Sequence, residues 1–199
     1  MKCRAILMCK APVPGRVKTR LMSRYTPVQA AAIYSRMLST TVSRAGRIFA
    51  DVWIAADVPG HACFKHQAYE LVPQGQGNLG QRMLRLMQRH FAKSADPVVF
   101  LGCDSPHMPD ERILLAFEAL AWSDIVIGPV EDGGYDLLGL CRPVESIFHD
   151  IDWGGPTVTE QTLGALEREH FTVHLLSSFY DLDTPEDLAR CGWEFMHTA

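Results

Sequence analysis

The sequence has no hydrophobic run long enough to cross a bilayer, and no cysteine or histidine spacing typical of a metal site. The apolar segment 5–9 is too short for the core of a secretion signal, so we expect a cytoplasmic protein without a membrane span. The six cysteines are scattered without a C-x-x-C pair, and the eight histidines form no H-E-x-x-H motif. We therefore expect reduced thiols and neither a disulfide framework nor a zinc centre.

Acidic residues are missing from the first quarter of the chain. Residues 1–50 contain ten Lys or Arg and no Asp or Glu, whereas residues 51–199 contain nine Lys or Arg and 23 Asp or Glu. The basic quarter indicates binding of an anion. A net charge of −4 disfavours a broad nucleic-acid surface. Pro12, Pro14 and Gly15 would break the amphipathic helix of an organelle transit peptide. We therefore expect a small phosphate-bearing ligand and no nucleic-acid partner.

A short apolar strand that ends in a carboxylate predicts an α/β fold. Residues 98–101 are Val-Val-Phe-Leu, as in a strand buried on both faces of a parallel sheet. Gly102 and Pro106 end the strand and leave Asp104 at its carboxyl end, the edge where open α/β sheets bind ligands. Capping of a turn or a helix is the alternative role for Asp104. With 199 residues, of which 47% are apolar, residues 1–199 are expected to form a single domain.

Further strands and helices are predicted on both sides of this strand. Strands are expected at 2–9, 51–58, 69–72, 124–128 and 171–177, and helices at 27–46, 61–67, 81–92, 110–121 and 157–170. Thr26-Pro27 and Thr184-Pro185 are signals for helix starts. Tyr34 recurs at helical spacing with apolar neighbours and is expected in the core.

A basic loop follows the first strand, with the sequence Lys10-Ala-Pro-Val-Pro-Gly-Arg-Val-Lys-Thr-Arg-Leu21. Its prolines and glycine fix an extended, turning backbone that carries Lys10, Arg16, Lys18 and Arg20. Lys supplies a mobile charge and Arg a planar fork, so the mixture favours a diphosphate over a single carboxylate. It is not a Walker A loop, since Val17 precedes the lysine where that motif has Gly. A solvated surface loop is the alternative.

Residues 75–80, Gly-Gln-Gly-Asn-Leu-Gly, match the dinucleotide-binding pattern G-x-G-x-x-G and precede a predicted helix. Pro73 and Gln74 separate this pattern from the preceding strand, and Asp104 lies farther along than the acidic residue of that fingerprint. An NAD site is therefore the less favoured interpretation. A glycine-rich loop opposite a nucleotide base is the preferred one.

Two acidic segments are candidates for chemistry. Asp181 and Asp183 are two residues apart, so in extended backbone they point the same way, and with Asp104 they could hold Mg²⁺ or Mn²⁺. Helix capping is the alternative use of these acids. Glu131 and Asp132 precede a Gly-Gly pair that predicts a hairpin turn, and glycines there would also let the backbone approach a ligand closely.

Taken together, these segments resemble one known family. The resemblance rests on the basic loop 10–21, Leu-Gly-Gln-Arg-Met at 79–83, Gly-Cys-Asp-Ser-Pro at 102–106, the segment 128–140, Trp153-Gly154 and Asp-Leu-Asp-Thr-Pro-Glu-Asp-Leu at 181–188. Over nearly the whole chain, the sequence resembles the bacterial selenium-domain-associated transferases, a branch of the glycosyltransferase-A, or nucleotide-diphospho-sugar transferase, superfold. The more distant relative is 2-phospholactate guanylyltransferase. The resemblance implies a three-layer α/β/α sandwich with a mostly parallel mixed sheet that has one antiparallel strand.

The resemblance also implies a site with a nucleotide over the amino-terminal half of the sheet. When the binding residues of the family are carried over by position, the phosphates would lie against Lys10, Pro12, Gly15, Arg16, Lys18 and Arg20. The base would lie near Gly75 and Asn78, and the transferred group near Gly133, Gly134 and Tyr135. Asp104 and Asp183, with Asp181 beside them, would hold the metal. Glycosyltransferases of this superfold usually have D-x-D at the strand end. The segment Cys103-Asp104-Ser105 has a single acidic residue, which is the pattern of nucleotidyltransferases.

The leading hypothesis is a Mg²⁺- or Mn²⁺-dependent transferase that uses a nucleotide-diphosphate-linked donor, most simply a nucleotide sugar. Lys18 and the metal would neutralise charge on the phosphates, and Glu131 or Asp132 would act as the base toward an acceptor hydroxyl. A nucleotidyltransferase that releases pyrophosphate is the first alternative. A nucleotide-sugar-binding module without turnover is the second. The base, the sugar and the acceptor are not specified by the sequence.

Overall fold

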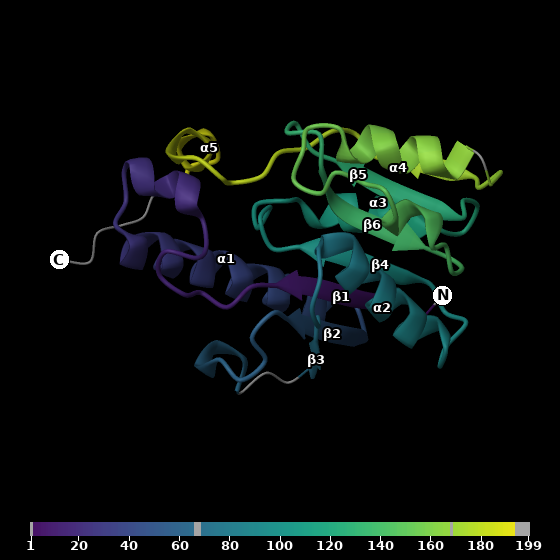
Figure 1. Ribbon diagram of the computed structural model, residues 1–199, viewed down its shortest axis with the longest axis horizontal. Coiled ribbons are helices and arrows are strands. Elements are labelled where there is room, and N and C mark those ends of the chain that lie inside the picture. The colour runs from purple at the N-terminus through teal and green to yellow at the C-terminus, as the bar shows by residue number, and fades with distance from the viewer. Residues whose placement is uncertain (1, 66–68, 168, 194–199) are drawn as a thin grey trace.

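The computed structural model describes residues 2–65, 69–167 and 169–193, and within these ranges seven strands form one sheet (Figure 1). The strands are β1 Arg4–Cys9, β2 Asp51–Ala56, β3 Glu70–Pro73, β4 Val98–Gly102, β5 Ile125–Pro129, β6 Tyr135–Leu140 and β7 Val173–Leu175. Their order across the sheet is β3-β2-β1-β4-β6-β5-β7. Strand β6 is antiparallel to β4 and β5, and the other pairs are parallel. This is the predicted mixed sheet with one antiparallel strand.

Helices cover both faces of the sheet (Figure 1). They are α1 Pro27–Ile48, α2 Leu79–Phe91, α3 Asp110–Ala119, α4 Val158–Glu167 and α5 Pro185–Arg190, with short 3-10 helices η1 Thr19–Ser23, η2 Ala62–Phe64 and η3 Ser146–Phe148. Alternate residues of β1 enter different cores, because successive side chains of a strand point to opposite faces. Ala5 and Leu7 lie in the core that includes α1 and α3, and Ile6 lies in the core that includes α2 and η3. The predicted three-layer α/β/α arrangement is confirmed.

Most element boundaries follow local signals. Capping boxes begin α1 after Thr26 and α5 after Thr184, as predicted. A third, at Asn78, begins α2 at Leu79, two residues before the predicted start. The predicted strand 171–177 is shorter, Val173–Leu175, because β7 is an edge strand with one partner, β5. The predicted helix 157–170 ends at Glu167, and the predicted helix 61–67 is the single turn Ala62–Phe64. Residues 66–67 of that prediction lie outside the described residues.

The connection between β5 and β6 is the predicted hairpin. Gly133 in its turn has φ +89°, and a Cβ there would lie 1.8 Å from the carbonyl oxygen of Pro156. Only glycine fits both conditions, because the backbone is left-handed and another loop packs against it. All six cysteines lie within the described residues, and no disulfide joins any two of them. Along the described ranges, each helix is too short or too polar to cross a membrane.

Candidate functional site

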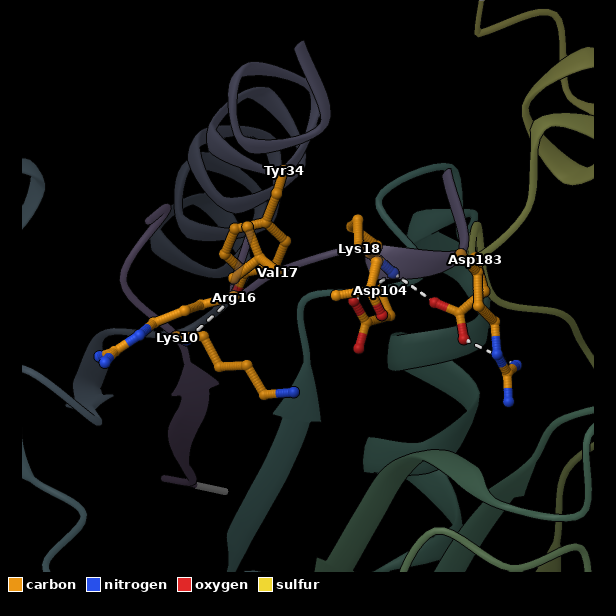
Figure 2. A pocket seen from close by; sticks show the side chains of 9 residues that line it. Lys10, Arg16, Val17, Lys18, Tyr34, Asp104 and Asp183 are labelled. Atoms are coloured by element: carbon orange, nitrogen blue, oxygen red, sulfur yellow. Dashed lines mark hydrogen bonds and ion pairs between the residues drawn. The ribbon is translucent and has the colours of Figure 1, made fainter. Parts of the chain in front are cut away.

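A pocket of about 190 Å³ lies beyond the carboxyl ends of β1 and β4 (Figure 2). Two hydrogen bonds between backbone segments shape it. Ala11 N donates to Asp57 Oδ1 at 2.7 Å, which ties the basic loop to the end of β2. Leu182 N donates to the carbonyl oxygen of Asp104 at 2.9 Å, which ties the segment before α5 to the loop after β4. The lining residues are Lys10, Arg16, Val17, Lys18, Thr19, Arg20, Tyr34, Asp104 and Asp183.

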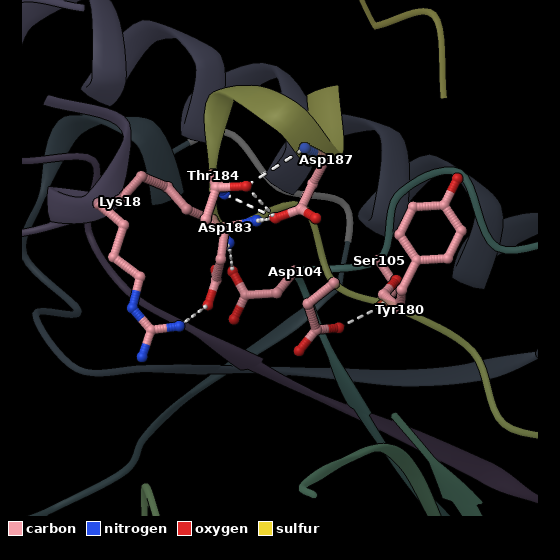
Figure 3. Close-up of polar contacts among 9 residues, drawn as sticks. Lys18, Asp104, Ser105, Tyr180, Asp183, Thr184 and Asp187 are labelled. Atoms are coloured by element: carbon pink, nitrogen blue, oxygen red, sulfur yellow. Dashed lines mark hydrogen bonds and ion pairs between the residues drawn. The ribbon is translucent and has the colours of Figure 1, made fainter. Parts of the chain in front are cut away.

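Lys18 lies at the centre of the charged cluster in this pocket. Its Nζ forms ion pairs with Oδ1 of Asp104 and, at 2.6 Å, with Oδ1 of Asp183 (Figures 2 and 3). The Lys18 side chain is 4% exposed. Its backbone has φ 47° and ψ 47°, a left-handed conformation that is unfavourable for a residue with a Cβ. Such strain persists where the surroundings hold it, and it is concentrated at functional sites.

The charges of this cluster support one another. Burial alone would lower the pKa of Lys18, but the carboxylates of Asp104 and Asp183 outweigh it and raise the pKa above its ordinary value. Burial opposes ionisation of Asp104 in the same way, and the ammonium of Lys18 outweighs it and lowers that pKa. The ammonium of Lys18 and the carboxylate of Asp104 therefore stabilise each other in their charged forms.

The other three predicted cations also line the pocket. Arg20 is 3.5 Å from Oδ2 of Asp183. Lys10 and Arg16 are exposed, and neither forms an ion pair with a described residue. Figure 2 shows their side chains extended on the left, separate from the Lys18 cluster on the right. The pocket thus combines one neutralised cation with cations that are available to an incoming anion.

Asp181 takes a different partner from Asp183. Its Oδ1 accepts a hydrogen bond from Ser105 Oγ, which also lies 3.3 Å from the carbonyl oxygen of Tyr180 (Figure 3). Burial, followed by the charge of Asp104, raises the pKa of Asp181 to about 7. Within the described ranges, no group of three His, Cys, Asp or Glu side chains is arranged to hold a metal ion.

The carboxylates of Asp104 and Asp183 nevertheless fit a hard divalent ion. Both direct one oxygen at the same point, and that point is occupied by the ammonium of Lys18. Oxygen ligands of this kind are typical of Mg²⁺ sites that complete their coordination with phosphate and water. Asp181 lies outside this pair because Ser105 binds its carboxylate.

The two residues predicted as bases lie outside the pocket lining. Glu131 forms a two-pronged ion pair with Arg190 at 2.7 and 2.9 Å, and the hydrogen bonds from Arg190 lower the pKa of Glu131. Asp132 Oδ1 accepts a hydrogen bond from Gly134 N at 2.9 Å, within the hairpin turn. Both residues follow β5, whose carboxyl end faces the same edge of the sheet as that of β4.

The glycine-rich loop 75–78 connects β3 to α2 and does not line the pocket. Its Asn78 caps α2 by accepting from Gln81 N at 2.9 Å, and a Cβ at Gly77 would lie 2.1 Å from the side chain of Gln81. Gly75, at φ +80°, lies against the guanidinium of Arg85. The loop follows an edge strand, whereas a dinucleotide fingerprint follows a central one. Its glycines are explained by the helix cap and the turn.

Gly133, Gly134 and Tyr135 lie on the opposite side of β4 from the basic loop. The carbonyl oxygens of Gly133 and Gly134 accept from Thr159 N at 2.9 Å and Thr159 Oγ1 at 2.7 Å. Tyr135 contributes to a second, mostly apolar pocket of about 70 Å³ that also contains Gly102. Pro12 and Gly15 shape the basic loop but do not line the larger pocket.

Tyr34 is a pocket residue that the sequence does not reveal. Its helical spacing predicts a core position, and 3% exposure agrees with that prediction. Its hydroxyl, however, accepts a hydrogen bond from Lys10 N at 2.9 Å, so it anchors the start of the basic loop. One signal in the sequence could have indicated this contact. A tyrosine stands among Ala, Ile and Met on a helix face predicted to be buried, and a buried hydroxyl needs a hydrogen-bond partner.

Solved structures share this architecture. A protein from Desulfovibrio desulfuricans G20, described as a candidate nucleotide-diphospho-sugar transferase, has a TM-score of 0.87 and 32% identity over 94% of this chain and 85% of its own. CMP:2-keto-3-deoxy-manno-octonic acid synthetase complexed with CTP has a TM-score of 0.61 and 11% identity over 96% of each chain. Rv0371c from Mycobacterium tuberculosis H37Rv, in complex with manganese, has a TM-score of 0.56 and 13% identity over 96% of this chain and 98% of its own.

The first similarity shows the fold of a nucleotide-diphospho-sugar transferase, and the last two show a shared fold alone. No curated protein matches the chain. A family model described as "Uncharacterized protein conserved in bacteria (DUF2064)" matches residues 38–155, which is more than half of the sequence, and the chain therefore belongs to the DUF2064 family.

Proposed function

We propose that this protein is a metal-dependent transferase that uses a nucleotide-diphosphate-linked donor, with a nucleotide sugar as the simplest candidate. The proposal rests on the pocket that Lys10, Arg16 and Arg20 line, together with the Lys18 ammonium that Asp104 and Asp183 hold. Cations on one side and paired carboxylates on the other suit a diphosphate that arrives with a divalent ion. The similarity to a candidate nucleotide-diphospho-sugar transferase supports the same reading.

In this proposal each group has a defined task. Lys10, Arg16 and Arg20 bind phosphate oxygens, and Lys18 stabilises the negative charge that grows on the leaving phosphate. Asp104 and Asp183 hold Mg²⁺ or Mn²⁺, which would supply further charge neutralisation when bound. Asp132 is the better candidate for a base toward the acceptor hydroxyl, because the ion pair with Arg190 makes Glu131 a weaker proton acceptor.

A nucleotidyltransferase is the second candidate. One observation favours it: the end of β4 presents a single acid, Asp104, between Cys103 and Ser105. In that reaction an acceptor phosphate would attack the α-phosphorus of a nucleoside triphosphate and release pyrophosphate. The two candidates therefore differ in product, since sugar transfer releases a nucleoside diphosphate.

A thermal unfolding screen tests the proposal. The protein is heated with each nucleoside mono-, di- and triphosphate, with nucleotide sugars and with NAD, in Mn²⁺ and in chelator. A ligand at a hundred times its dissociation constant stabilises a protein by about 2.7 kcal/mol, which is readily detected. We expect a metal-dependent shift with one nucleotide series, and loss of that shift in Asp104→Asn. A shift with NAD alone, or with nucleotides equally in chelator, would contradict the proposal.

A matched control and a product assay complete the test. Asp124 is an acidic residue immediately before the start of β5, with partners Arg142 and Thr172, and it does not line the pocket, so Asp124→Asn should keep the ligand-induced shift. Incubation of the binding nucleotide with candidate acceptors then separates the two reactions. Release of a nucleoside diphosphate indicates sugar transfer, and release of pyrophosphate indicates nucleotidyl transfer.

A further inference from the structure

The ammonium of Lys18 occupies the point at which two carboxylates converge. Its Nζ lies 2.6 Å from Oδ1 of Asp183 and is also paired with Oδ1 of Asp104. A Mg²⁺ ion bound by the same oxygens would lie about 2.0–2.1 Å from each of them. The ammonium and the ion therefore require the same space, and a divalent ion cannot bind both carboxylates while Lys18 stays in place.

The charge balance leads to the same conclusion. With Lys18 in place, its buried ammonium and the guanidinium of Arg20 already face the two carboxylates. A divalent ion added beside the ammonium would give this cluster an excess of positive charge. A diphosphate that enters with the ion restores the balance. It also gives the displaced ammonium a new anionic partner.

The pocket provides a place for that partner. It extends from Asp104 and Asp183 to the exposed side chains of Lys10 and Arg16. Figure 2 shows the guanidinium of Arg16 directed away from the Lys18 cluster and the ammonium of Lys10 directed toward the side of Asp104. Lysine has a flexible four-carbon stem, so its ammonium can move from carboxylate to phosphate while the backbone stays in place.

We infer that Lys18 is a resident cation that excludes a bare divalent ion, so that the site accepts its metal only as a metal–diphosphate complex. The inference rests on the proposed function and adds to it the form in which the ligand binds. It assigns Lys18 two successive partners, the carboxylates in the free protein and a phosphate in the complex.

Direct measurement of Mn²⁺ binding tests this inference without an activity assay. Free Mn²⁺ is followed by electron paramagnetic resonance during titration of the full chain and of Lys18→Met. Wild type should bind bare Mn²⁺ weakly. Lys18→Met should bind Mn²⁺ at least about tenfold more tightly, because the ion no longer has to displace the ammonium from Asp104 and Asp183. A tenfold change in affinity is less than the two charge-assisted hydrogen bonds together contribute. The same ion should also raise the melting temperature of Lys18→Met and leave that of wild type nearly unchanged.

Two further variants make the result decisive. Lys18→Gly removes the side chain and suits the left-handed backbone, so it serves if Lys18→Met folds poorly. Lys10→Met removes the same charge from the same pocket without a contact to either carboxylate among the described residues. Its Mn²⁺ affinity should rise much less than that of Lys18→Met, because the charge of Lys10 is exposed and acts on Asp104 only at a distance.

The outcomes separate this inference from the proposed function. Equal or weaker binding of bare Mn²⁺ by both Lys18 variants overturns the inference. If wild type then still binds a nucleoside diphosphate (ADP, CDP, GDP or UDP) in a metal-dependent way, the proposed function stands alone. If the Lys18 variants bind Mn²⁺ tightly but no nucleotide stabilises wild type, the resident cation is supported and the proposed function fails.

Discussion

Acidification should destabilise the protein through His107, which lies in the loop between β4 and α3. Its ring stacks on Phe179, with 4.7 Å between ring centroids, and packs against Tyr180 at 4.3 Å. Both ring nitrogens are buried without a hydrogen bond to a described residue. Burial, followed by the positive charges of Arg44 and Arg190, lowers the pKa of His107 from 6.5 to about 4. The folded protein therefore holds this ring neutral in a range where the unfolded chain protonates it.

The sign and the size of the effect follow from this difference. Above pH 6.5 the ring is neutral in both states and contributes no pH dependence. As the pH falls from 6.5 toward 4, the unfolded state binds the proton first, and the free energy of unfolding decreases. Each unit of pKa difference corresponds to about 1.4 kcal/mol, so the loss through His107 is about 3 kcal/mol by pH 4.

Urea denaturation of wild type and His107→Phe at pH 7 and pH 4 measures this loss. Phenylalanine keeps the aromatic stacking and removes the titration. The stability of the variant relative to wild type should therefore rise by about 3 kcal/mol between the two pH values. Other titrating groups cancel in this comparison. A His107→Phe difference that is equal at both pH values would refute the reasoning.

Two further predictions concern the hairpin and the buried ion pair. Gly133→Ala should lower the free energy of unfolding by about 3 kcal/mol, since the new Cβ meets the Pro156 carbonyl in a left-handed backbone. Gly154→Ala, at φ +94° with open space around it, should cost only about 1 kcal/mol, and equal losses in urea denaturation would contradict the steric argument. Arg112→Met should cost about 3–5 kcal/mol at pH 7, because it leaves Asp136 buried without its partner at 3.1 Å. Since burial already raises the pKa of Asp136 to about 6, part of that loss should disappear at pH 5, and a constant loss would argue against it.

Local signals in the sequence predict much of this fold. The apolar run 98–101 became β4, and the Thr-Pro pairs at Thr26 and Thr184 begin α1 and α5. These features depend on neighbouring residues alone, which is why the sequence is sufficient for them. The tight packing at Gly77 was not predicted, because the side chain of Gln81 lies where a Cβ of residue 77 would be only when Gln81 folds back to cap α2 with Asn78.

The site is predictable in part. The cations of the basic loop are contiguous in sequence, so their gathering at one pocket could be expected. The hydrogen-bond and ion-pair partners of individual side chains could not be expected, since they depend on packing between distant segments. Asp181 accepts a hydrogen bond from Ser105, and Glu131 forms an ion pair with Arg190. The spacing of these residues in the sequence does not indicate either pairing.

The ion pair between Lys18 and Asp183 joins residues that are 165 positions apart. During synthesis the basic loop, β1 and β4 are available long before the segment that precedes α5. Chains emerge from the ribosome at about 5–20 residues per second and begin to fold from the amino terminus. Of its two carboxylate partners, Lys18 therefore meets Asp104 first and Asp183 later. The charged cluster around Lys18 is thus completed only after the segment that contains Asp183 has left the ribosome.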